Sequence, residues 1–118
     1  MGIAKEVINS NEDYHSILAA YETVFLLFVS ATCPACERAV QLFEPVAKAY
    51  EHRVKSLVLD TATTPRLEPV TGTPTLVTHV DGKLKEVFKG FGPWETQEQT
   101  IEAIFSRYAQ PGASDAPA

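Results

Sequence analysis

Apolar and polar residues recur along the chain with two different periods, as they do in domains that combine strands with helices. A continuous apolar run rich in β-forming residues at 23–30 predicts a strand buried on both faces, and 54–60 predicts a second buried strand. Apolar residues at helical spacing predict helices over 10–21, 37–53 and 96–108. Two further predicted strands, 73–80 and 83–90, flank Asp81-Gly82, a pair typical of a two-residue hairpin turn.

The order of these elements predicts the class of fold. Adding a short strand at 5–9 and a short helix or turn at 63–70 gives the order β-α-β-α-β-α-β-β-α. This order is typical of an α/β domain with a central mixed sheet of about five strands and helices on both faces. We expect that domain to cover residues 1–109. The tail, 110–118, lacks apolar residues that could hold it against a core, and we expect it to be disordered.

Composition and charge exclude some classes of function. A chain of 118 residues can bury one core without disulfide or metal support. A net charge of −5 without a basic cluster argues against a nucleic-acid partner, and the longest apolar run, 24–29, is too short to span a membrane. We therefore expect a monomer with no nucleic-acid or membrane partner. We expect it in the cytoplasm, or in the periplasm or outside the cell if a signal peptide was removed.

The two cysteines of the chain, Cys33 and Cys36, fall where the most apolar strand meets a helix. If Cys33 is the N-cap, Pro34 takes the first helical position, and the amides of Ala35 and Cys36 point at the Cys33 sulfur. This arrangement favours a thiolate, so we expect the pKa of Cys33 to lie below the value of about 8.5 of a free thiol. Cys36, one turn further on, is expected to be buried and to keep a higher pKa. These differences predict that Cys33 is the nucleophile and that Cys36 resolves the mixed disulfide.

A cysteine pair can also form part of a metal site or a structural disulfide. A structural zinc site needs four ligands, and His15, His52 and His79 lie at no familiar spacing from the cysteines. We expect no bound metal, and we expect these histidines to be surface or strand residues. A purely structural disulfide closing so short a loop constrains the unfolded chain very little. A redox pair is the favoured interpretation, and it requires no bound cofactor because the dithiol is itself the redox group.

The C-x-x-C at a strand-to-helix junction, the order of elements and the later "TGTPTLV" resemble the thioredoxin family. The resemblance implies the thioredoxin fold, with Pro34 and Ala35 supporting the active site. It also implies a cis-proline at Pro74, whose preceding residue, Thr73, would expose its backbone to an extended substrate. The family glycine that keeps the groove rim low corresponds to Gly90. We name Thr32 and Trp94 as further groove candidates, with packing as the alternative role of Trp94.

The chain departs from the family pattern at several positions. Typical thioredoxins read W-C-G-P-C, whereas Thr32 replaces the tryptophan here, and C-P-x-C also occurs in glutaredoxins and in disulfide carriers of the bacterial periplasm. The buried aspartate of the family corresponds to Leu27, and its partner lysine corresponds to Ser56. The family's proton route to Cys36 is therefore missing, which leaves water or the nearby Glu37 to carry that proton.

These observations predict a thiol-disulfide oxidoreductase that acts on protein disulfides and is recycled by a reductase or a thiol donor. A glutaredoxin-like or disulfide-donating enzyme is the alternative within the same chemistry, although "GFGPWET" matches a glutathione motif only loosely. A non-catalytic module that binds partners in a groove between Pro34 and Pro74 is the alternative from another class. The residues leave the direction of electron flow open.

Overall fold

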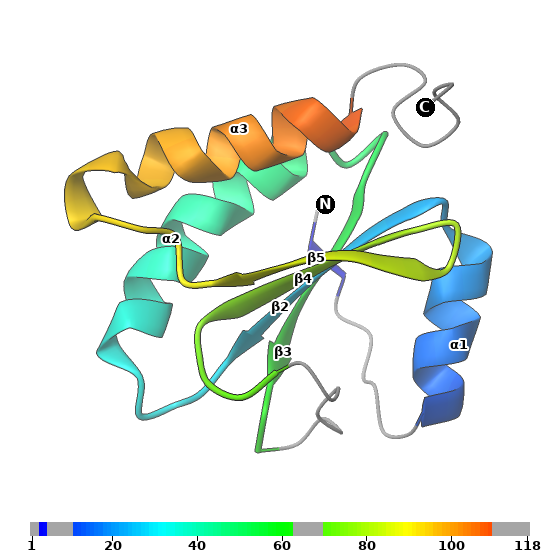
Figure 1. Cartoon of the computed structure of the whole chain (residues 1–118), viewed down its shortest axis with the longest axis horizontal. Coiled ribbons are helices and arrows are strands. Elements are labelled where there is room, and N and C mark those ends of the chain that lie inside the picture. The colour runs from blue at the N-terminus through cyan, green and yellow to red at the C-terminus, as the bar shows by residue number, and fades with distance from the viewer. Residues whose placement is uncertain (1–2, 5–10, 63–69, 110–118) are drawn as a thin grey trace.

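A mixed β-sheet forms the centre of the computed structural model, which describes residues 3–4, 11–62 and 70–109 (Figure 1). The strand order is β1-β3-β2-β4-β5. The bounds of the strands are β1 Ile3–Ala4, β2 Thr23–Val29, β3 Lys55–Asp60, β4 Thr75–Val80 and β5 Lys83–Lys89. β1, β3 and β2 run parallel, and β4 is antiparallel to both β2 and β5. The predicted mixed sheet of five strands is confirmed, with β1 contributing two residues.

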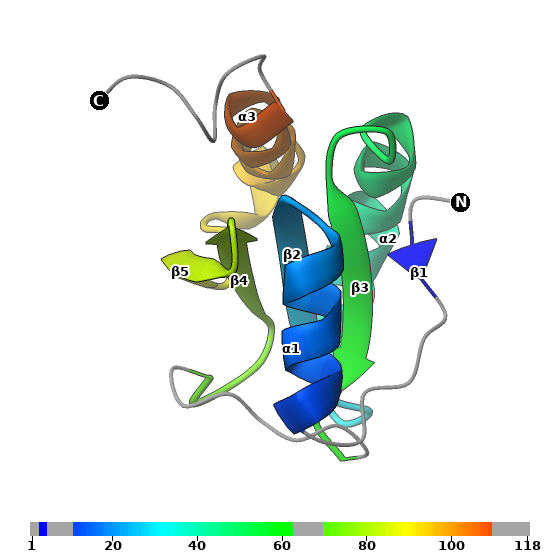
Figure 2. The ribbon, with the colours of Figure 1, turned by 90° about the vertical axis from the view of Figure 1, so that its right-hand side faces the viewer.

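Helices cover both faces of this sheet. α1 spans Asn11–Ala20, α2 spans Pro34–Ala49 and α3 spans Gln97–Ala109, preceded by a single 3-10 turn, η1, at Trp94–Thr96. Figure 2 shows α1 on one side of the sheet and α2 and α3 along the other. None of the helices in the described ranges is both long and apolar enough to cross a membrane.

The central strand β2 divides the interior into two cores. Phe25 and Leu27 pack toward α2 and α3, whereas Val24, Leu26 and Phe28 pack toward Tyr14 of α1. Because successive side chains of a strand point to opposite faces, a continuous apolar run is what a strand covered on both sides requires. The prediction of a strand buried on both faces is confirmed here.

The described elements follow the predicted order. Asp81 and Gly82 have φ values of 54° and 79°, so both central residues of the hairpin turn are left-handed, as a type I′ turn requires. Four predictions fall outside the described residues: the strand at 5–9, the helix start at Ser10, most of the helix or turn at 63–70, and the disordered tail at 110–118. The described first strand lies just ahead of the predicted one, at Ile3–Ala4.

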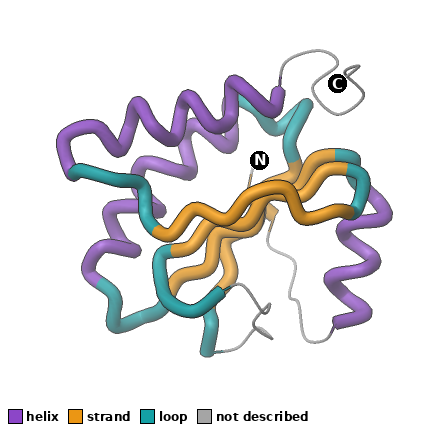
Figure 3. Tube along the Cα trace, viewed as in Figure 1, coloured by secondary structure: helices purple, strands orange, loops and turns teal. Residues whose placement is uncertain are grey.

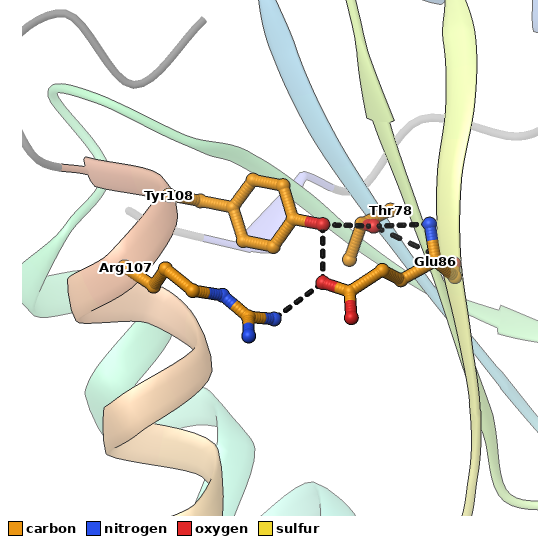
Figure 4. Close-up of polar contacts among 4 residues, drawn as sticks. All are labelled: Thr78, Glu86, Arg107 and Tyr108. Carbon is orange, nitrogen blue, oxygen red and sulfur yellow. Dashed lines mark hydrogen bonds and ion pairs between the residues drawn. The ribbon is translucent and has the colours of Figure 1, made fainter. Parts of the chain in front are cut away.

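A polar network joins α3 to the hairpin of β4 and β5 (Figure 4). The Glu86 amide donates to the Thr78 hydroxyl over 3.0 Å, and that hydroxyl lies 3.0 Å from the Tyr108 hydroxyl. The Glu86 carboxylate accepts from both Tyr108 and Arg107. Burial, together with the hydrogen bond to Glu86, raises the pKa of Tyr108. The network holds β5 against α3, and these two elements flank the loop that passes the candidate site.

Candidate active site

Cys33 and Cys36 lie between the end of β2 and the first turn of α2, and they form a disulfide. Cys33 is the N-cap residue, with extended backbone angles of φ −108° and ψ 102°, and Pro34 opens the helix. A proline is tolerated at that position because its missing N–H would have no partner inside the helix. The predicted capping arrangement is confirmed, and it fixes the Cys33 sulfur at the positive end of the helix dipole.

The surroundings of the two sulfurs differ. The Cys36 amide donates to the Cys33 sulfur over 3.1 Å. The second amide expected to face that sulfur, of Ala35, does not serve as a donor to it in the structure, so the cap rests on one hydrogen bond. Cys33 is half-buried, whereas the Cys36 side chain is only 3% exposed. A thiolate at Cys33 would therefore be both accessible and stabilised, while Cys36 is shielded.

A cis peptide bond joins Thr73 to Pro74, immediately before β4, as the resemblance implied. The Cys33 sulfur lies 3.6 Å from the Thr73 carbonyl oxygen. Ser30 connects the same two segments, because its hydroxyl lies 3.2 Å from the Thr73 hydroxyl and its carbonyl accepts from the Cys33 amide over 3.3 Å. Ser30 was not predicted as a site residue, because no pattern in the sequence marks a serine at the end of a strand as a partner of Thr73.

Two surface hollows are lined by the residues of this contact. One, of about 350 Å³, is lined by both cysteines together with Val29, Ser30, Ala31, Glu37, Val40 and Gln41. The other, of about 190 Å³, is lined by Thr71, Gly72, Thr73, Pro74, Thr75, Lys89 and Gly90. The contact between the Cys33 sulfur and the Thr73 carbonyl thus joins a residue that lines the first hollow to a residue that lines the second.

Gly90 lies beside Pro74 in the second hollow, as the resemblance implied. Its amide donates to the Pro74 carbonyl over 2.9 Å, and its φ is 85°. Glycine adopts this left-handed conformation without the steric penalty that a Cβ would bring. A Cβ added at Gly90 would have no atom within 4 Å, so it would project into open space. The left-handed φ of 85° accounts for a glycine at this position.

The other two groove candidates, Thr32 and Trp94, are both exposed. Thr32 is exposed and lines neither hollow. Trp94 also lines neither hollow, and 57% of its side chain is exposed, which argues against a role in core packing. Its indole instead lies against the Arg38 guanidinium of α2, whose carbon is 4.1 Å from the ring centroid.

The positions of the family's buried charged pair are apolar or neutral in this chain. Leu27 is fully buried in the core under α2, and Ser56 is fully buried on β3. The Ser56 hydroxyl has no hydrogen-bond partner among the described residues. Glu37 lines the same hollow as both cysteines, which places a carboxylate at the mouth of the site.

The histidines lie away from the cysteines. His15 and His52 are exposed, and His79 is buried on β4, where burial lowers the pKa of its imidazole. Residues 3–4, 11–62 and 70–109 contain no group of three or more His, Cys, Asp or Glu side chains arranged to hold a metal ion.

The chain is similar to known proteins in sequence and in structure. A family model described as Thioredoxin matches residues 5–103. The oxidised thioredoxin of Plasmodium falciparum is 19% identical, with 91% of this chain and 100% of that chain covered and a TM-score of 0.72. A mutant thioredoxin of Halobacterium salinarum is 19% identical over 87% of this chain and 88% of that chain, with a TM-score of 0.72.

The thioredoxin of Malassezia sympodialis has a TM-score of 0.74 at 16% identity, with 88% of this chain and 90% of that chain covered. At these identities the structural matches establish the fold, and the thioredoxin fold expected from the sequence is confirmed. No curated protein sequence matches the chain.

Proposed function

The chain belongs to the thioredoxin family, and on that premise we propose that it exchanges disulfides with protein substrates through Cys33 and Cys36. The observation that carries the proposal is the asymmetry of the pair, in which a half-buried Cys33 accepts a hydrogen bond from the amide of a buried Cys36. This difference suits thiol-disulfide exchange, because one sulfur meets the substrate while the other stays within reach to resolve the mixed disulfide.

The reduction of a substrate disulfide proceeds in two exchanges. The Cys33 thiolate attacks one substrate sulfur, the substrate S–S bond breaks, and the other substrate sulfur leaves as a thiolate that takes up a proton. Cys36 then loses its proton and attacks the Cys33 sulfur. The mixed disulfide breaks, the second substrate sulfur leaves, and the Cys33–Cys36 disulfide forms. Two electrons pass from the dithiol to the substrate, and a reductase or a thiol donor returns them.

Backbone and hydroxyl groups around the pair have supporting roles in this proposal. The Thr73 carbonyl, 3.6 Å from the Cys33 sulfur, offers backbone hydrogen bonding to an extended substrate beside its disulfide. Ser30 keeps Thr73 and Cys33 together through its hydroxyl and its carbonyl. The proton of Cys36 leaves into the hollow that Glu37 lines, because the position of the family's buried aspartate is occupied by Leu27 in this chain.

A redox titration against glutathione buffers tests the proposal and gives the direction of electron flow. A reversible dithiol couple is expected. A midpoint potential of about −270 mV would identify the protein as a reductant, and one of about −120 mV would identify it as a disulfide donor. A protein whose cysteines show no reversible couple would rule out both directions of exchange.

Cysteine variants separate exchange from binding without turnover. Cys33→Ser should abolish exchange with protein disulfides, whereas Cys36→Ser should accumulate a covalent complex with its substrate, visible by mass spectrometry and reversed by dithiothreitol. Retention of the full exchange rate by Cys33→Ser would remove Cys33 as the nucleophile. A chain that captures no substrate through Cys36→Ser and catalyses no exchange would instead fit a binding module.

A further inference from the structure

The loop after β5, residues 90–96, is attached to both sides of the candidate site. At its start the Gly90 amide donates to the carbonyl of Pro74, which enters β4. Near its end the Trp94 carbonyl accepts from the Arg38 guanidinium of α2 over 3.3 Å. In Figure 3 this loop leaves β5 and reaches α3 on the side of the molecule where α2 begins. The loop therefore links the strand entry that carries the cis-proline to the helix that carries the cysteines.

The course of the loop between these attachments is also fixed. Phe91 is 3% exposed and packs in the core with residues of α2 and α3. Gly90 and Gly92 flank it with φ values of 85° and 82°, so the backbone turns sharply on each side of the buried ring. The Gln97 side-chain amide donates to the Gly92 carbonyl over 3.2 Å. These contacts fix the backbone of the loop on the approach to Trp94.

Arg38 holds the Trp94 indole from the helix side. Its guanidinium carbon lies 4.1 Å from the ring centroid, a distance typical of a cation–π contact. Arg38 follows Pro34 by one helical turn, which places both residues on the same face of α2. Pro34 is exposed and adjoins Cys33. The indole is thus anchored to the face of α2 that carries the exposed part of the redox motif.

Trp94 is unusual among the large apolar side chains of the described residues because it is exposed and yet fixed in place. Three large apolar side chains are at least 41% exposed in the described ranges: Tyr21, Leu84 and Trp94. Tyr21 follows α1 and Leu84 adjoins the β4–β5 turn, so Trp94 is the one fixed to α2. The residue before Cys33, where thioredoxins carry a tryptophan, is the small polar Thr32. The exposed aromatic side chain on this face of α2 is instead Trp94 of the loop.

We propose that Arg38 and Trp94 are specificity determinants for protein substrates. Arg38 positions the Trp94 indole, and the indole contacts the polypeptide that flanks the substrate disulfide. The inference rests on the proposed exchange activity. A small disulfide has no flanking polypeptide to reach the indole. The pair should therefore contribute to recognition of a protein disulfide and much less to recognition of a small one.

Kinetics on two substrates test this role. The probes are insulin, as a protein disulfide, and 5,5′-dithiobis(2-nitrobenzoate), as a small one. Arg38→Ala and Trp94→Ala should each lower the ratio of kcat/KM for insulin to kcat/KM for the small disulfide by about two- to fivefold, mainly through KM. Arg38→Lys keeps the charge without the planar guanidinium and should recover part of the loss. Arg53→Ala, which removes an exposed cation beyond the other end of α2, should leave the ratio unchanged.

A ratio that stays constant in Arg38→Ala and Trp94→Ala would overturn the inference, and so would an equal loss on both substrates. Failure of the wild-type protein to reduce either probe would count against the proposed function itself.

Fluorescence gives a readout that does not depend on turnover, because Trp94 is the single tryptophan of the chain. In Cys36→Ser, Cys33 is joined by a disulfide either to a single-cysteine peptide or to 2-mercaptoethanol. The peptide adduct should change the emission of Trp94 and its quenching by iodide, and the small adduct should change them much less. Adding Arg38→Ala should reduce this difference. Identical emission from both adducts would show that flanking polypeptide does not reach the indole.

Discussion

The Cys36 backbone amide lies 3.1 Å from the Cys33 sulfur and donates a hydrogen bond to it. The buried cysteine of the pair thereby favours negative charge on the half-buried one, in addition to the contribution of the helix N-terminus. The reactivity expected of Cys33 therefore depends on a hydrogen bond from the residue expected to resolve its mixed disulfide.

Limited alkylation of the reduced protein should modify Cys33 before Cys36. The reason is that Cys33 combines access to solvent with stabilisation of its thiolate, whereas Cys36 is 3% exposed. Peptide mapping by mass spectrometry after a short exposure to iodoacetamide near neutral pH measures the order. The same reaction in denaturant is the control and should label both residues equally. Preferential labelling of Cys36 in the folded protein would contradict the assignment.

Gly90→Ala should lower the free energy of unfolding by about 1 kcal/mol, because an L-residue at this left-handed φ of 85° is strained. Gly72→Ala is the matched control, since a Cβ at either position would meet no atom within 4 Å and Gly72 does not have a left-handed φ. Urea denaturation measures both variants. An equal effect at the two glycines would show that the conformation of Gly90 is not what requires glycine.

Ser56→Ala should raise the free energy of unfolding by about 1 kcal/mol, because it removes a buried hydroxyl that has no partner within the described ranges. Thr78→Val is the contrasting variant, since the Thr78 hydroxyl accepts from the Glu86 amide and contacts the Tyr108 hydroxyl. Its loss should destabilise the protein by about 1–2 kcal/mol. Chemical denaturation at neutral pH compares them, and destabilisation by Ser56→Ala would indicate that its hydroxyl is satisfied after all.

Acidification should destabilise the protein in part through His79, whose pKa burial lowers from the usual 6.5. The unfolded chain then binds a proton at a pH where the folded imidazole remains neutral. The free energy of unfolding should therefore be highest above pH 6.5 and should fall as the pH drops through 6.5 toward the folded pKa.

Denaturation of the wild-type protein and His79→Gln at about pH 7.5 and about pH 5.5 measures this contribution. His79→Gln should show a smaller fall, whereas His52→Gln, at an exposed position, should keep the wild-type fall. Equal falls in all three proteins would exclude His79 as a source of the pH dependence.

Features that depend on near neighbours in the chain can be predicted from the sequence. The apolar run of β2 predicted a strand buried on both faces, and Asp81-Gly82 predicted the hairpin turn. The step from Cys33 to Pro34 predicted the N-cap and the first helical position. Each of these follows from periodicity or from the conformational preferences of a few consecutive residues.

Contacts between residues that are distant in the sequence depend on the folded arrangement of the whole domain. Ser30 contacts Thr73 across 43 positions, and Arg38 contacts the Trp94 carbonyl across 56. The sequence left open whether Trp94 lines the groove or serves as a packing anchor, and its contact with Arg38 arises only when the loop packs on α2. Local patterns carry no information on such pairs, because strand order and helix packing bring them together only once the whole sheet has formed.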